Sequence, residues 1–178
     1  DTAQNYGMAE EMMRPALKDG YRDRCFLATK VSQDFSRAGI RQAIECSLRL
    51  LGVDYVDLYQ VHRWDANYPI AETMEEMARL QQEGKTRYVG VSNFTVEQMQ
   101  QALAVAPFQA NQVGYNMLNR KIEGDVISFC QRAGIGVLAH SPLAKGLLTG
   151  KYQPGHLFPE SDYRSHLPYF QGEQFVRY

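Results

Sequence analysis

The 178-residue chain repeats one pattern along most of its length: an amphipathic helix, a glycine, a short apolar stretch and then a polar residue. The apolar stretches are only four to seven residues long and do not alternate with polar residues. Continuous apolar strands are typical of parallel sheets that are covered on both faces. Because helix and strand alternate strictly, the pattern predicts βα units around a parallel sheet.

Five helices and five strands can be placed on this pattern. Helices are expected over residues 8–18, 40–51, 70–83 and 122–133, and a shorter one begins at Thr95, where Thr95 and Gln98 have the spacing of a capping box. Gly52, Gly84 and Gly134 follow three of these helices as C-terminal stops. Strands are expected over residues 26–31, 55–61, 88–91, 110–113 and 135–139.

From about residue 153 the alternation stops. Pro154, Pro159 and Pro168 lie in this segment, which predicts a long irregular loop or tail over residues 153–178 that packs poorly. His156 and His166 are ten residues apart and show no ligand spacing, so no metal site is expected. With 44% hydrophobic and 22% charged residues, the chain is large enough for one core, and we expect residues 1–178 to form a single domain.

Charge and cysteine content exclude several classes of protein. The net charge is −1 and opposite charges are interspersed, which gives no reason to expect nucleic acid or an anionic membrane as a partner. No apolar run approaches the roughly 18–20 residues that span a bilayer. Cys25, Cys46 and Cys130 are odd in number and lack CxxC spacing. We therefore expect a reduced, cytoplasmic protein without a disulfide framework or a zinc site.

Polar residues with catalytic potential follow the expected strands. Alone, a lysine or histidine at a strand end is usually a solvated loop residue, a tyrosine is usually a packing residue, and Asp1 could cap the helix that follows. In a (β/α)8 barrel, however, the active site is assembled from the C-terminal ends of successive strands. The polar landmarks lie about 20 to 32 residues apart and are Asp1 with Tyr6, Lys30, His62, Ser92–Asn93, Asn111–Gln112 and His140–Ser141.

Six segments of the chain resemble the conserved blocks of the aldo-keto reductase family, in order and in distance. DTAQNYG at residues 1–7 is similar to the signature that carries the catalytic aspartate and tyrosine. The later blocks are LATKV around Lys30, DLYQVHRWD around His62, RYVGVSNF around Asn93, ANQVGYN at Gln112 and AHSPLAKGLLTGKY over residues 139–152. The resemblance covers essentially the whole chain. It implies a (β/α)8 TIM-barrel fold, of which this chain would form an open arc of about five parallel βα units.

The resemblance also implies a reaction: NAD(P)H-dependent reduction of aldehydes and ketones, which are small carbonyl substrates. Hydride transfer leaves negative charge on the carbonyl oxygen, so an acid must supply a proton. Tyr6 is the expected acid, and Lys30 favours its phenolate form. Asp1 is expected to pair with Lys30, and His62 to hydrogen-bond the substrate carbonyl.

The remaining blocks imply contacts with the cofactor, expected to be NADPH, with NADH left open. Ser92, Asn93 and Gln112 would hold the nicotinamide carboxamide. His140 stands where the family commonly has a tyrosine that stacks on the nicotinamide. Trp64 could line the substrate pocket or simply pack on a strand-end loop. The pyrophosphate would follow the backbone of Ser141, Leu143 and Gly146, with Lys145 nearby.

A complete eight-stranded barrel needs about 250 residues, so we expect segments to be missing from both ends of this chain. An open arc would leave two unpaired strand edges, at residues 26–31 and 135–139. Besides a reductase, two alternatives remain open: a non-enzymatic nicotinamide-binding relative such as a channel β-subunit, and an inactive partial gene product. Met74 and Met77 are expected in the core, and no feature of the sequence indicates an oligomeric state.

Overall fold

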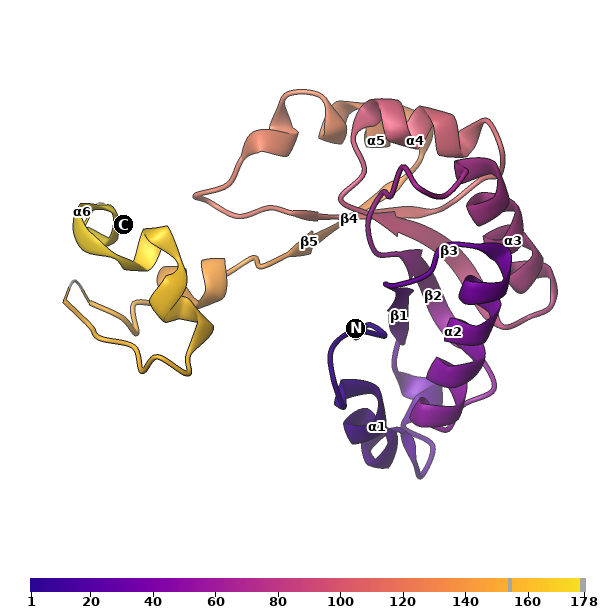
Figure 1. Cartoon of the computed structure of the whole chain (residues 1–178), viewed down its shortest axis with the longest axis horizontal. Coiled ribbons are helices and arrows are strands. Elements are labelled where there is room, and N and C mark those ends of the chain that lie inside the picture. The colour runs from indigo at the N-terminus through magenta and orange to yellow at the C-terminus, as the bar shows by residue number, and fades with distance from the viewer. Residues whose placement is uncertain (154, 177–178) are drawn as a thin grey trace. The chain divides into compact units, whose positions relative to one another are not determined.

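The computed structural model describes residues 1–153 and 155–176. The chain divides into two compact units, Asp1–Val113 with Ile122–Leu138, and Gly114–Lys121 with Ala139–Tyr178 (Figure 1). The single domain expected over residues 1–178 stays a prediction. Pro154, Arg177 and Tyr178, which belong to the expected tail, lie outside the described residues.

One five-stranded sheet carries the βα pattern, and its strands follow one another in sequence order. Neighbouring strands from β1 to β4 are parallel, which confirms the predicted partial barrel. In the register of the sheet, Lys30 lies beside Gln60 and Gln60 beside Gly90. The strands are β1 (Ala28–Val31), β2 (Val56–Val61), β3 (Thr86–Ser92), β4 (Ala110–Gly114) and β5 (Gly136–His140).

The helices begin and end largely where the sequence predicts. Gly52 and Gly134 have φ angles of 69° and 68° and cap two helices in the left-handed conformation. Thr95 and Gln98 form the expected capping box. The first helix is shorter than expected because Pro15 lies in a 3₁₀ turn that follows it. The helices are α1 (Ala9–Met13), α2 (Arg37–Leu51), α3 (Ile70–Gln82), α4 (Val96–Leu103), α5 (Val126–Ala133) and α6 (Gly172–Val176).

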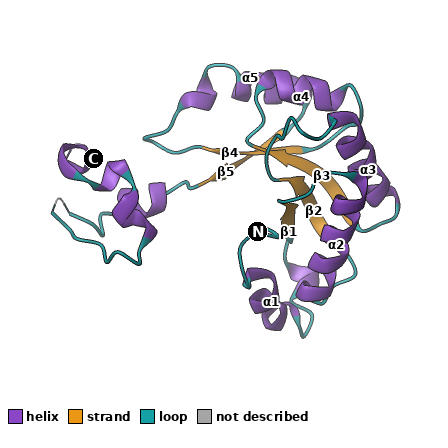
Figure 2. Ribbon diagram, in the orientation of Figure 1, coloured by secondary structure: helices purple, strands orange, loops and turns teal. Residues whose placement is uncertain are grey.

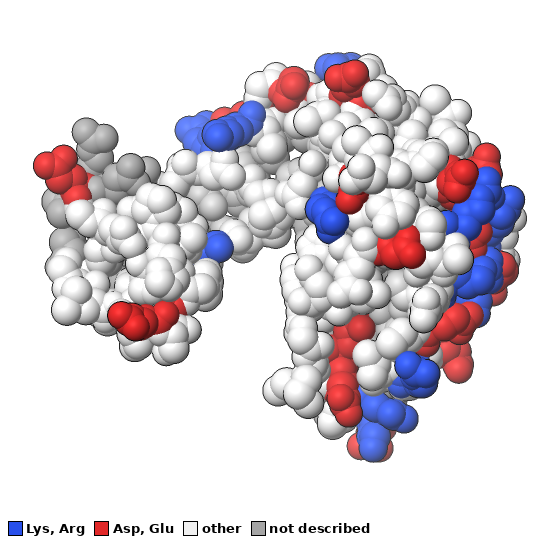
Figure 3. All heavy atoms as spheres, in the orientation of Figure 1, with Lys and Arg blue, Asp and Glu red and all other residues white. Residues whose placement is uncertain are grey.

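Helices α2, α3 and α4 cover the outer face of the sheet (Figure 2). Ile40, Ile44, Met74 and Met77 are fully buried between helices and strands, so both methionines are core residues as predicted. Burying each such side chain stabilises the fold by about 1.5–3 kcal/mol. Acidic and basic side chains are interspersed over the outer surface of α2 and α3 (Figure 3), where Arg41 pairs with Glu83.

A small cluster of buried side chains, Ala28, Leu58 and Ala110, lies outside the main core. A Cβ atom at Gly90 would lie 3.0 Å from the Gln60 side chain and 3.1 Å from the Ala110 carbonyl oxygen, so only glycine fits without a shift. The middle strands are therefore closely packed at Gly90.

Of the two sheet edges that were expected to be unpaired, the one at β1 differs from the expectation. The N–H groups of Thr2 and Gln4 donate to the carbonyl oxygens of Ala28 and Lys30, so the edge at β1 is partly paired by the segment before it. β5 is the other edge, and its residues Gly136–Ala139 are exposed rather than covered on both faces. Among the described residues, no strand pairs with the outer side of β5, as expected of an open arc.

The second unit contains most of the expected tail. It holds 3₁₀ turns at Ala144–Thr149, Tyr163–His166 and Pro168–Phe170, followed by α6. Poor packing was expected here, but the structure has a small core of its own, made of Ala144, Leu147, Phe170 and Phe175. Packing of apolar and aromatic side chains therefore holds this unit together, although it contains little regular secondary structure. Within the described residues, no helix combines the length and apolar character that crossing a bilayer requires.

Candidate active site

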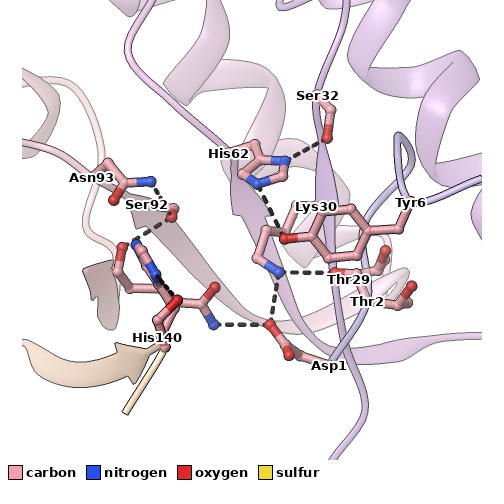
Figure 4. A network of polar contacts seen from close by, with 12 residues as sticks. Asp1, Thr2, Tyr6, Thr29, Lys30, Ser32, His62, Ser92, Asn93 and His140 are labelled. Atoms are coloured by element: carbon pink, nitrogen blue, oxygen red, sulfur yellow. Dashed lines mark hydrogen bonds and ion pairs between the residues drawn. The ribbon is translucent and has the colours of Figure 1, made fainter. Parts of the chain in front are cut away.

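Four of the predicted catalytic side chains meet at the C-terminal ends of β1 and β2 (Figure 4). Lys30 lies in β1 and His62 directly follows β2. Asp1 and Tyr6 come from the segment that pairs with the edge of β1. That pairing brings Asp1 and Tyr6 close to Lys30, although both precede it by more than 20 positions in the sequence.

Lys30 is the most buried member of the group, with 1% of its surface exposed. Its ammonium donates to Asp1 Oδ2 at 2.7 Å and to the Thr2 carbonyl oxygen at 2.9 Å. Burial disfavours the charged form and lowers the pKa of Lys30 from 10.5 to about 8. An ammonium with this pKa can change its protonation state within the neutral to mildly basic range.

Tyr6 lies between Lys30 and His62. Its hydroxyl oxygen is 3.5 Å from His62 Nε2, and Lys30 Nζ is 5.2 Å from the centre of its ring. The tyrosine side of the group is open, because Tyr6 is 49% exposed. A hydroxyl and an imidazole therefore meet at one accessible position, with a buried ammonium near the tyrosine ring, which is an arrangement suited to proton transfer.

Ser32 belongs to this group although the sequence analysis did not single it out. Its Oγ lies 2.6 Å from His62 Nδ1, on the side of the ring opposite Tyr6 (Figure 4). It is 2% exposed. The available signal was its position two residues after Lys30, which brings it to the same strand end.

A second polar group lies at the ends of β3 and β4. Ser92 Oγ and the Asn93 N–H both donate to the Gln112 carbonyl oxygen, at 2.9 and 2.8 Å. The Asn93 amide donates to Ser92 Oγ at 3.0 Å. Asn93 has a φ of 60°, a left-handed conformation that asparagine tolerates better than most residues. These contacts bring the three expected carboxamide-binding residues together.

Asp1 joins the two groups. Its Oδ2 atom accepts from Lys30 and also from Gln112 Nε2, at 2.9 Å. The carboxylate is 44% exposed on its side chain, whereas both donors are buried. The expected proton-transfer residues and the expected amide-binding residues therefore share one carboxylate.

The other expected cofactor residues lie in the second unit, around a pocket of about 390 Å³. His140, Ser141 and Lys145 line it together with Lys121, which the sequence analysis missed. Leu143 is 56% exposed on the same loop.

The backbone of this loop is unusual. Ser141, Ala144 and Lys145 have φ angles of 55°, 47° and 59°, and Gly146 has 98°. Left-handed residues in a turn can aim successive N–H groups at an anion, and such strain clusters at functional sites. Two lysines and this backbone suit a diphosphate group.

Trp64 lies near the strand end in the first unit. Its ring packs edge-on against Phe94, with centres 5.4 Å apart, and it is partly buried against the main core. This contact supports the packing role, while a role in the substrate pocket stays a prediction. Among the described residues, no group of three or more His, Cys, Asp or Glu side chains is arranged to hold a metal ion.

Comparisons with known proteins identify one family. The profile described as "Aldo/keto reductase family" matches residues 1–172. The chain is 42% identical over 190 residues to the aldo-keto reductase YhdN of Bacillus subtilis (strain 168), an alignment that covers 100% of this chain and 57% of that protein.

Solved structures give the same result. The glycerol dehydrogenase AKR11B4 of Gluconobacter oxydans matches with a TM-score of 0.91 and 37% identity, covering 99% of this chain and 59% of that one. An aldo/keto reductase of Klebsiella pneumoniae in complex with NADP and acetate matches with a TM-score of 0.78 and 39% identity, covering 88% of this chain and 57% of that one. The chain thus spans 57–59% of the length of these relatives.

Proposed function

The chain belongs to the aldo/keto reductase family, and from this premise we propose that the full-length protein reduces aldehydes or ketones to alcohols with a nicotinamide cofactor. The observation that carries the proposal is the meeting of Tyr6, Lys30 and His62 at the C-terminal ends of β1 and β2. A solvated lysine, histidine or tyrosine would have no reason to converge in this way. The relatives' functions support the same reaction class.

Tyr6 supplies the proton in this reaction. When a carbonyl carbon accepts hydride, negative charge develops on its oxygen, and the Tyr6 O–H bond breaks as the new O–H bond forms. An unperturbed tyrosine, with a pKa of about 10, is a reluctant acid near neutrality. The Lys30 ammonium favours the resulting phenolate, and Asp1 keeps the ammonium in place.

His62 binds and orients the carbonyl group. Its Nε2 atom lies next to the Tyr6 hydroxyl, so a carbonyl oxygen that contacts one also contacts the other. A hydrogen bond aimed at the position where charge develops stabilises the transition state more than the ground state. The histidine therefore contributes electrostatic stabilisation as well as position.

Ser92, Asn93 and Gln112 bind the carboxamide of the cofactor and set which face of the ring meets the substrate. The cofactor supplies the hydride. The loop with Ser141 and Lys145 lines the diphosphate, and the lysine supplies positive charge. We propose NADPH as the physiological cofactor, a choice supported by the Klebsiella pneumoniae relative in complex with NADP.

The test is NADPH oxidation by the full-length protein with a panel of model aldehydes and ketones. We expect aldehyde-dependent turnover, with alcohol formed in equal amount. A protein that binds NADPH tightly and turns over no carbonyl compound would instead be a nicotinamide sensor. A protein that does neither would be an inactive gene product, and both results would contradict the proposal.

A further inference from the structure

Ser32 is held in place by three separate contacts, and only one of them involves its hydroxyl. Its backbone N–H donates to Gln4 Oε1 at 3.0 Å, and its carbonyl oxygen accepts from Arg63 Nη1 at 2.5 Å. Gln4 in turn donates its own N–H to the Lys30 carbonyl oxygen. The backbone of Ser32 is thus tied to the segment before β1 and to the residue after His62.

The fixed backbone leaves the hydroxyl aimed at one atom. Ser32 Oγ lies 2.6 Å from His62 Nδ1, a short distance for a hydrogen bond to nitrogen. The serine is 2% exposed, so bulk water competes little for this contact. A hydroxyl can donate to Nδ1 or accept from it, so this contact ties the orientation of the serine hydroxyl to the position of the ring proton.

A neutral imidazole has one nitrogen that donates and one that accepts. If Nδ1 accepts from Ser32, the ring proton must reside on Nε2. Nε2 is the nitrogen beside the Tyr6 hydroxyl, where a substrate carbonyl oxygen must lie to receive the proton of Tyr6. In the opposite tautomer, the Nε2 lone pair would face that oxygen and repel its developing charge.

We propose that Ser32 is a positioning residue: its hydroxyl donates to His62 Nδ1 and holds the imidazole in the neutral tautomer that carries its proton on Nε2. A hydroxyl has no charge, so unlike a carboxylate partner it does not favour the imidazolium form. The inference builds on the proposed reductase function, because the Nε2 proton matters most when a carbonyl group is bound.

The direct test is nuclear magnetic resonance of the full-length protein labelled with ¹⁵N-histidine and saturated with NADP⁺. Long-range ¹H–¹⁵N correlations distinguish the two neutral tautomers from imidazolium, and His62→Asn assigns the signals. We expect wild-type His62 to carry its proton on Nε2. Ser32→Ala should give a mixture of tautomers, and Ser32→Thr, which keeps the hydroxyl, should restore the wild-type pattern.

Kinetics provide the second readout. Loss of the outer hydrogen-bond partner of a metal-bound histidine typically costs about 10–100-fold, and for the same orienting role we expect kcat of Ser32→Ala with an aldehyde to fall by a similar factor. The dissociation constant for NADPH should stay within about twofold, because Ser32 does not touch the amide-binding residues. Ser32→Thr should recover most of kcat.

Ser47→Ala is the matched control. Ser47 is a buried serine on α2, and among the described residues its hydroxyl has no hydrogen-bond partner. The same change there should alter neither the His62 spectrum nor kcat.

Two results would overturn the proposal: a wild-type His62 that is protonated on Nδ1 or on both nitrogens, or a Ser32→Ala protein whose tautomer is unchanged. If Ser32→Ala fails to fold, the wild-type and Ser32→Thr spectra still show whether His62 carries its proton on Nε2. A wild-type protein without carbonyl turnover would contradict the reductase function alone, since the spectrum is recorded without substrate.

Discussion

Gln112 and Asp1, 111 residues apart in sequence, are joined by a hydrogen bond of 2.9 Å from Nε2 to Oδ2. The same oxygen accepts from Lys30 at 2.7 Å. One carboxylate atom therefore receives both the buried ammonium of β1 and the side-chain amide of β4. A change at Asp1 should affect the charge of Lys30, whereas a change at Gln112 should affect mainly the binding of the cofactor.

The first prediction concerns the acid. Tyr6→Phe in the full-length protein should lower the rate of hydride transfer by at least ~100-fold, the lower limit for general acid catalysis. NADPH affinity should be nearly unchanged, because the phenol acts on the substrate. Single-turnover kinetics and a fluorescence titration measure the two quantities. Tyr21→Phe, at an exposed tyrosine outside the site, is the control. Near-normal turnover in Tyr6→Phe would exclude Tyr6 as the acid.

The second prediction is a pH dependence. Burial lowers the pKa of Lys30 to about 8. The ammonium is the main form below that pH and is lost above it. Carbonyl reduction that needs the charged lysine should therefore decline as the pH rises through about 8. Lys30→Met should be slow at every pH and lack this decline. A wild-type rate that stays constant from pH 7 to 9.5 would contradict the assigned role.

The third prediction separates the two partners of Asp1. Asp1→Asn removes the charge that stabilises the ammonium, so the pKa of Lys30 should fall further and the decline in rate should move to lower pH. Gln112→Leu leaves the Asp1–Lys30 ion pair intact. It should therefore weaken NADPH binding without changing the pH at which the rate declines. Full pH–rate profiles of both variants provide the measurement. Equal displacement of the two profiles would mean that Gln112 also controls the charge of Lys30.

Much of this arrangement follows from the sequence because parallel βα units place successive strand ends at one edge of the sheet. The strand-end positions of Lys30, His62, Asn93 and Gln112 could be predicted from the order and spacing of the apolar stretches and the polar residues in or after them. The contact between Asp1 and Gln112 could not, since it depends on how the segment before β1 pairs with the sheet edge. The spacing of apolar residues carries no information on how an irregular segment pairs with the edge of a sheet.

Ser32 was missed for a similar reason. A serine after a strand has many ordinary roles, and only the distance to His62 Nδ1 distinguishes this one. The small core around Phe170 was also unexpected, because scattered aromatic residues among prolines show no helical or strand period. Periodicity detects elements of regular structure, whereas contacts between loops depend on side-chain geometry in three dimensions.

The fourth prediction tests cofactor binding at Asn93. Asn93→Ala should weaken NADPH binding by about 1–3 kcal/mol if the amide bonds to the carboxamide. Alanine is also strained at the observed φ of 60°, whereas glycine is not. Asn93→Gly therefore removes the side-chain amide without the backbone strain, and we expect it to lose a similar amount of NADPH-binding free energy. If Asn93→Gly kept full NADPH affinity and only Asn93→Ala lost it, the loss would come from backbone strain and not from the missing amide.

The last prediction concerns the 178 residues expressed alone. The number of strands, their tilt and their stagger are linked in a closed barrel, and five strands in this order leave β5 as an edge. Val137 and Leu138 on that edge are 36% and 38% exposed. An exposed apolar edge is a template for pairing with another chain. The edge at β1 is less available, because Thr2 and Gln4 already pair with it.

We therefore expect this chain alone to aggregate and to show no aldehyde-dependent NADPH oxidation. Light scattering after size-exclusion chromatography and a thermal melt measure the first property. Val137→Lys places a charge on the β5 edge and should reduce aggregation. Leu157→Lys removes a more exposed apolar side chain, 88% accessible and outside any strand, and should have little effect. A monodisperse, cooperatively melting monomer with measurable turnover would show that the arc is self-sufficient. Equal rescue by both variants would mean that general surface apolarity, and not the β5 edge, drives association.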